Sequence, residues 1–175
     1  VRGAHYVAVA AGWGGGGWSY VPPYRAASRY GNANRLLVFR LDGTRVPLPK
    51  PLPPLEVAPP APPQAAGVTP AVLAQGKALF LANCAICHSN QPRSISPDLR
   101  RLLTEVHVAF NEIVLRGALL PGGMPRWDDL LSEADANAIH AYLIDLQAST
   151  RARELDLKRR GKPLDTHEPM VMSNF

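Results

Sequence analysis

The chain has 175 residues, of which 46% are hydrophobic and 19% charged, a composition that fits one compact domain with additional segments. This apolar content argues against disorder over most of the chain, no run of about 18 apolar residues offers a transmembrane helix, and two cysteines exclude a disulfide scaffold. The net charge of +5 does not favour nucleic-acid binding, because residues 1–63 carry seven Lys or Arg against two Asp or Glu, whereas residues 64–175 carry twelve of each.

Residues 1–46 contain two stretches typical of strands. Residues 6–11 form a short apolar run that predicts a buried strand, and residues 35–41, followed by a turn-forming Asp-Gly pair, predict a second. A glycine-rich loop at 12–17 lies between them. Since two strands cannot bury a core alone, we expect this segment to be the margin of a larger sheet.

Residues 47–66 are predicted to be a linker. Nine of the 17 positions from 47 to 63 are proline, which favours extended polyproline II and excludes a helix or a central strand. Because patterned sequence lies on both sides, a semi-rigid spacer between folded bodies is favoured over a disordered tail.

Residues 67–150 carry helical patterns. Thr69-Pro70 combines an N-cap with a proline at the first helical position and predicts a helix over 70–83. A second helix is expected over 106–116, and a third begins at Ser132, where Asp135 completes a capping box. The third helix has a buried stripe at helical spacing, formed by Ala136, Ile139, Leu143 and Leu146. Residues 151–175 are mixed charged and polar, which predicts a loosely held tail.

The main chemical signal is the sequence Cys84-Ala85-Ile86-Cys87-His88. Two thiols three residues apart can add to the two vinyl groups of one haem, and the adjacent histidine then lies under the iron as a proximal ligand. A thioredoxin-like site is the weaker alternative, because a helix rather than a strand precedes the first cysteine. A zinc site needs more ligands than the sequence offers nearby.

A six-coordinate iron needs a second axial ligand, and Met124 is the predicted one. It lies in a Pro-Gly-Gly-Met-Pro loop before the third helix, where core filling is a poor alternative role for a methionine. Other residues have suitable donor atoms but less favourable contexts: Met170 and Met172 in the tail, His107 as an expected surface residue, His140 with a surface or packing role, and His5 and His167.

Residues 70–148 resemble a class I c-type cytochrome. The spacing Gly76-x-x-x-Phe80-x-x-x-Cys84 is similar to that family's first helix, and Tyr142 stands where the family keeps an aromatic residue in its last helix. The resemblance implies a mainly α fold of three to five helices around one covalent haem c. It also implies that the Pro97 carbonyl accepts a hydrogen bond from His88. Trp127, next to the methionine loop, is expected to shield the haem edge or to pack.

The flanks resemble the C-terminal part of PQQ-dependent quinohaemoprotein alcohol dehydrogenases. That family has a β-propeller, a proline-rich linker and a cytochrome domain in this order, and residues 6–43 are similar to the end of the propeller. The resemblance implies that PQQ and calcium belong only to the full-length parent enzyme. It also implies that Trp13, Gly14 or Gly15 approaches PQQ there.

These patterns together predict electron transfer through the haem, from PQQ to an external acceptor such as a cytochrome, a blue-copper protein or quinone. Arg100, Arg101, Arg116 and Arg126 are candidates for pairing with haem propionates or with an acidic partner, or are solvated surface charges. Covalent haem attachment predicts a periplasmic location. Since the chain lacks an initial Met and an export leader, we expect processing or a longer parent chain.

Three alternatives remain at this stage. The chain can be a stand-alone electron carrier, a cytochrome fused to a different dehydrogenase, or a haem sensor with an exchangeable axial position. The sensor is disfavoured because Met124 offers a sixth ligand.

Overall fold

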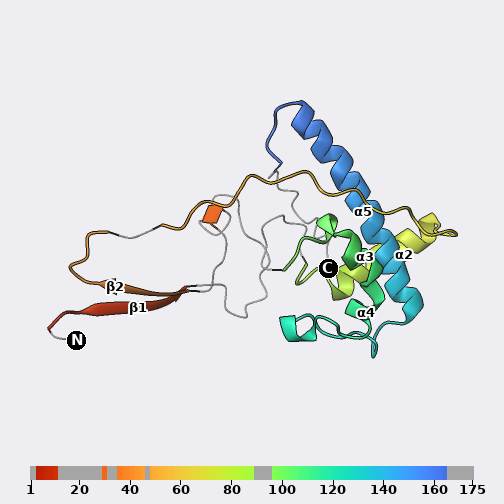
Figure 1. Cartoon of the computed structure of the whole chain (residues 1–175). Coiled ribbons are helices and arrows are strands. Elements are labelled where there is room, and N and C mark those ends of the chain that lie inside the picture. The colour runs from red at the N-terminus through yellow and green to blue at the C-terminus, as the bar shows by residue number, and fades with distance from the viewer. Residues whose placement is uncertain (1–2, 12–28, 31–34, 46–47, 89–95, 165–175) are drawn as a thin grey trace.

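The computed structural model describes residues 3–11, 29–30, 35–45, 48–88 and 96–164, and it has a mainly α architecture with one small sheet (Figure 1). The sheet consists of β1 (Tyr6–Ala11) and β2 (Arg35–Arg40). The helical body follows in the order α2 (Pro70–Asn83), η1 (Leu99–Arg101), α3 (Thr104–Val108), α4 (Phe110–Val114), η2 (Leu120–Gly122) and α5 (Glu133–Arg159). None of the helices in these ranges has the length and apolar character needed to span a bilayer.

Strands β1 and β2 pair antiparallel, with Tyr6 opposite Arg40 and Ala11 opposite Arg35. The two predicted strands are therefore confirmed, but the expectation that the first is buried is wrong. Val7 is 54% exposed and Val38 is 58% exposed, because no other described strand extends this two-stranded sheet. The glycine-rich loop with Trp13, Gly14 and Gly15 lies outside the described residues.

Helix α2 has the bounds that its sequence predicts. The Thr69 hydroxyl accepts from the Val72 amide, and Pro70 occupies the first turn. Helix α2 packs across α5 so closely that a Cβ built on Gly76 would lie 1.9 Å from the Ala138 carbonyl oxygen. One turn later, Phe80 packs against Tyr142 with ring centroids 5.5 Å apart.

The core lies between α2, α5 and the shorter elements that connect them in sequence, among them α4. Its buried members are Phe80, Ala85, Leu102, Phe110, Val114, Leu131, Ala136, Ile139 and Leu143. Three of the four residues predicted for the α5 stripe are among them, and the fourth, Leu146, packs against the cluster.

The second predicted helix, over 106–116, is instead two short helices. The chain leaves helical geometry at Ala109, with φ −90° and ψ 12°, which directs Phe110 to stack on His140 at 4.4 Å. The second of them, α4, ends at Val114 because the Val114 carbonyl accepts from the Trp127 amide at 2.9 Å rather than from a further helical turn.

Helix α5 begins at the predicted capping box, in which Ser132 and Asp135 bond reciprocally. The prediction of a loosely held tail from residue 151 onward is wrong for residues 151–159, because these residues continue helix α5. Polar residues on this part of α5 are buried rather than solvated: Thr150 is 5% exposed and Glu154 is 2% exposed. The Glu154 carboxylate has partners in the proline-rich segment, at the Ala58 amide, and at Arg101.

Residues 55–64, here called the strap, run along α5 rather than acting as a free spacer (Figure 1). The Ala58 amide donates to Glu154 Oε2 at 2.7 Å, and Ala58 is fully buried. The Gln147 amide donates to the Pro59 carbonyl at 3.2 Å, and Gln64 donates to the Ala141 carbonyl at 2.7 Å. Prolines leave their carbonyls free to accept, so the strap suits a helix face that offers donors.

His107 was expected at the surface, and that expectation is wrong. Its Nε2 lies 3.1 Å from Gln147 Oε1, and its Nδ1 lies 2.9 Å from His140 Nε2. Gln147 presents an acceptor there because its NH₂ group donates to carbonyls, so His107 donates from Nε2. Burial and the nearby His107 lower the pKa of His140 to about 4.

We predict that Gly76→Ala lowers the free energy of unfolding by about 3 kcal/mol, because the added methyl meets backbone that cannot move aside. Urea unfolding of the purified chain measures this. Gly122→Ala is the matched control, since a Cβ there meets nothing within 4 Å. Equal stability of the two variants would contradict the close crossing.

We also predict that acid destabilises the fold through His140. Its folded pKa is depressed, so the unfolded state binds more protons between the unfolded pKa of 6.5 and the folded value of about 4, and stability falls as pH falls through that window. The free energy of unfolding of His140→Gln should depend less steeply on pH than that of the unaltered chain. His5→Gln, at an exposed position, should leave the slope unchanged. An unaltered slope in His140→Gln would argue against the assignment.

Candidate functional site

The two cysteines and His88 lie in a tight turn that follows α2 directly. The Cys84 amide still donates to the Phe80 carbonyl at 2.8 Å, and the Cys84 carbonyl accepts from Cys87 at 3.1 Å and from His88 at 2.9 Å. Three functional side chains therefore project from one turn. A helix, not a strand, precedes them, which disagrees with a thioredoxin-like site.

Neither cysteine is part of a disulfide; Cys84 is partly buried and Cys87 is exposed. Burial, together with the neighbouring Cys87, raises the pKa of Cys84 to about 11. A thiol that stays protonated at neutral pH is a poor redox or catalytic nucleophile. The raised pKa of Cys84 therefore disfavours thiol chemistry with turnover at this residue.

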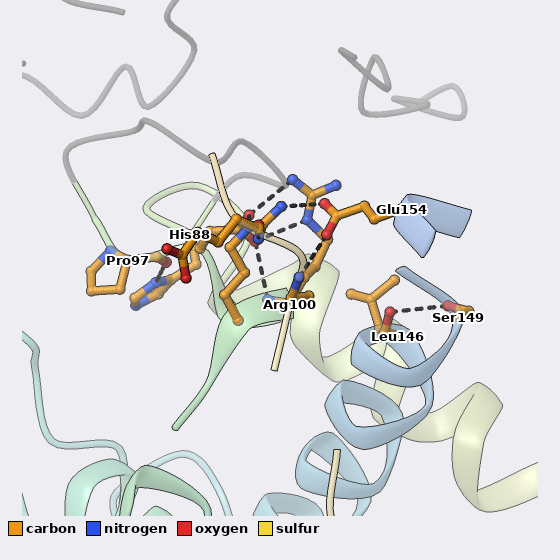
Figure 2. Close-up of polar contacts among 10 residues, drawn as sticks. His88, Pro97, Arg100, Leu146, Ser149 and Glu154 are labelled. Atoms are coloured by element: carbon orange, nitrogen blue, oxygen red, sulfur yellow. Dashed lines mark hydrogen bonds and ion pairs between the residues drawn. The ribbon is translucent and has the colours of Figure 1, made fainter. Parts of the chain in front are cut away.

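The His88 ring is held by backbone. Its Nδ1 lies 2.9 Å from the Pro97 carbonyl oxygen, and since a carbonyl only accepts, Nδ1 carries the hydrogen (Figure 2). The other ring nitrogen, Nε2, then presents a lone pair. This is the arrangement of a metal-ligating histidine, and it is the contact that the sequence resemblance implies for Pro97.

The residues after Pro97 are fixed by buried ion pairs. The Asp98 carboxylate caps η1 by accepting from the Arg100 amide at 3.0 Å, and it also accepts from Arg100 Nε at 2.9 Å. Arg101 pairs with Asp98 and with Glu154 of α5. Arg100 and Arg101 thus have carboxylate partners inside the protein, whereas Arg116 and Arg126 make exposed pairs with Glu112 and Asp128.

The methionine loop is shaped by glycine. Gly123 adopts φ 93°, a left-handed conformation, and donates to the Leu120 carbonyl at 3.0 Å. Met124 follows, partly buried, and packs against the edge of the core cluster, as does Trp127. The thioether is therefore carried by a loop and not by a helix face.

The surroundings fit a haem c. The available donors are two thiols, an imidazole nitrogen and a thioether, the set that class I c-type attachment and axial ligation use. Large apolar side chains close in sequence to the cysteine turn, η1 and the methionine loop are exposed: Ile86, Leu103, Leu119, Leu120 and Leu130. Across the described ranges, no group of three or more His, Cys, Asp or Glu is arranged to hold a bare metal ion.

Three of the other candidate axial ligands lie in the part of the chain that the structure describes. His107 and His140 bond to each other, and His5 precedes β1 at an exposed position. Met170, Met172 and His167 lie outside the described residues. Sequence reasoning missed Glu154 and Gln147, because their polarity is indistinguishable from that of a solvated helix face until the strap is in place.

Known proteins are similar to this chain. A family profile described as cytochrome C oxidase, cbb3-type, subunit III matches residues 71–143. The quinohemoprotein alcohol dehydrogenase ADH IIB of Pseudomonas putida is 39% identical over 152 residues, which is 82% of this chain and 21% of that protein. The chain thus spans about a fifth of the length of this relative.

Two further comparisons cover different parts of the chain. A cytochrome c6 of Chlorolobion braunii is 36% identical over 85 residues, 45% of this chain and 96% of that protein. The solved structure of the quinohemoprotein alcohol dehydrogenase ADHIIG from Pseudomonas putida HK5 matches with a TM-score of 0.61 and 29% identity, over 92% of this chain and 22% of that one.

We predict that Asp98→Asn destabilises the fold by about 3 kcal/mol, because it leaves two buried guanidinium groups without full compensation. Thermal or urea unfolding measures the loss. Asp128→Asn is the control, since it breaks an exposed pair with Arg126 that is worth less than about 1 kcal/mol. If both variants cost the same small amount, the buried pairs do not hold the segment after Pro97.

Proposed function

We propose, from the premise that the chain belongs to the c-type cytochromes and is homologous to the C-terminal part of quinohaemoprotein alcohol dehydrogenases, that it relays single electrons through one covalently bound haem c. The observation that carries this proposal is the Cys84–His88 turn, in which backbone orients the histidine ring. Bound haem c supplies a reversible Fe(II)/Fe(III) couple.

Each residue has a distinct task in this proposal. Cys84 and Cys87 would form the two thioethers to the haem, and His88 and Met124 would supply a nitrogen and a sulfur ligand to its iron. Pro97 fixes the His88 ring through the 2.9 Å contact, and Trp127 packs beside the methionine loop and keeps water from the edge of the site. A thioether ligand favours the ferrous state and raises the reduction potential.

The full-length parent enzyme is proposed to be a PQQ- and calcium-dependent alcohol dehydrogenase in the periplasm. In that enzyme PQQ would supply the two-electron oxidation of an alcohol, and this cytochrome domain would pass the electrons singly to an external cytochrome, blue-copper protein or quinone. The support is that the dehydrogenase relatives match 82% or more of this chain, including the region of β1 and β2.

A stand-alone carrier is the second candidate, favoured by the match to nearly the whole of a cytochrome c6. That match covers only 45% of the chain, whereas the dehydrogenase matches extend beyond the helical body. The hypothesis of a dehydrogenase parent therefore accounts for more of the sequence than the hypothesis of a stand-alone carrier.

We predict that Met124→Ala opens the sixth coordination position. The variant, produced with haem attached, should bind carbon monoxide rapidly and show a lower midpoint potential, because it lacks the sulfur ligand. The unaltered chain should resist carbon monoxide. Met172→Ala is the matched control and should behave like the unaltered chain. Rapid carbon monoxide binding by the unaltered chain would instead favour a haem sensor.

A further inference from the structure

Four charged side chains, Asp98, Arg100, Arg101 and Glu154, form a buried ionic cluster (Figure 2). Asp98, Arg100 and Glu154 are each at least nine-tenths buried, and the side chain of Arg101 is 15% exposed. Burying charges is costly unless each finds opposite charge and hydrogen bonds, so these side chains have little freedom to rearrange independently. A displacement of one of these four side chains is therefore expected to displace the others.

One side of the ionic cluster holds the strap. Glu154 accepts from the Ala58 amide at 2.7 Å, and Arg101 Nη1 donates to the Glu56 carbonyl at 2.7 Å. Arg151, one turn before Glu154 on α5, donates to the Ala58 carbonyl. The strap is the segment that precedes the helical body. Because Glu154 and Arg101 bond to the strap directly, a displacement of the strap changes the contacts of both residues.

The other side of the cluster holds the peptide that orients His88. Asp98 shares its peptide plane with the Pro97 carbonyl, and that carbonyl accepts from His88 Nδ1. Arg100 fixes the Asp98 carboxylate through three bonds of 2.9 to 3.0 Å, and the Arg101 amide donates to the Asp98 carbonyl at 3.0 Å. Figure 2 shows His88 and Pro97 on one side of Arg100 and Glu154 on the other.

We propose that Arg101 and Glu154 are positioning residues for His88, which couple docking of the strap to the strength of the Pro97–His88 hydrogen bond and so to the reduction potential of the site. This inference rests on the proposed function, in which His88 ligates the iron. The strap leads from the β1–β2 region to the helical body. Its packing against the helical body then adjusts the reduction potential of the site.

The sign of the effect separates positioning from simple electrostatics. A strong hydrogen bond to the ligand histidine makes its ring more basic and favours Fe(III), so loosening that bond raises the potential. Arg101→Gln removes a positive charge, and a field effect alone would favour Fe(III) and lower the potential. Loss of positioning predicts the opposite shift.

The experiment measures the midpoint potential of the haem-loaded chain by spectroelectrochemical titration. Arg101→Gln should raise the ferrous-to-ferric ratio at fixed applied potential by about tenfold, a shift of about 59 mV for one electron. Ala58→Pro, which removes the amide donated to Glu154 without changing charge, should shift the potential in the same direction. In both variants NMR should show faster exchange of the His88 Nδ1 proton.

Two controls match these variants. Ala61→Pro makes the same change three residues along the strap, where no bond from the amide is found among the described residues, and Arg116→Gln removes a positive charge from an exposed pair. Neither should raise the potential. Arg101→Lys keeps the charge and should restore part of the wild-type potential.

Several outcomes would overturn the inference. A lower potential in Arg101→Gln, or an unchanged potential in Ala58→Pro, means that the cluster acts only through its field or only on stability. If Arg101→Gln does not fold, the double variant Arg101→Gln/Glu154→Gln removes both charges together, and an unshifted potential there rejects the coupling. If the unaltered chain shows no histidine–methionine haem spectrum, the proposed function fails instead.

Discussion

The close crossing of α2 and α5 at Gly76 is the constraint on which the rest of the structure depends. No side chain larger than hydrogen fits against the Ala138 carbonyl, and the approach lets Phe80 reach Tyr142 one turn later. The end of α2 is thereby fixed relative to α5, and the Cys84 turn begins at that end. The proposed cofactor site is therefore anchored on the helix pair that forms the core.

The helical body also extends further than a minimal cytochrome pattern of three helices. The strap supplies carbonyls that Gln147 and Arg151 satisfy, and the last turns of α5 supply a carboxylate that the strap amide and Arg101 satisfy. These polar contacts are buried or partly buried, and a buried polar group without a partner is costly. The proline-rich segment is therefore part of the folded unit, and its position is connected through buried charges to the backbone that orients His88.

The sequence predicted those features whose signals lie within one or two turns. The Thr69-Pro70 start of α2, the Ser132 capping box and the Cys-x-x-Cys-His turn all depend on neighbours in the chain. What the sequence did not reveal depends on distant partners. Ala58 and Glu154 are 96 residues apart, and His107 meets His140 across 33 residues. Polar residues of this kind have the pattern of a solvated surface until their tertiary partners are known.

The most direct test of the account is the intact mass of the polypeptide under denaturing conditions, after production in a periplasm that attaches haem to c-type cytochromes. The account predicts a single species heavier than the 18.9 kDa chain by the mass of one haem, retained after acid and organic extraction. A chain at its bare polypeptide mass, with the haem extracted or never bound, would contradict the roles of Cys84, Cys87 and His88 on which the electron-transfer function depends.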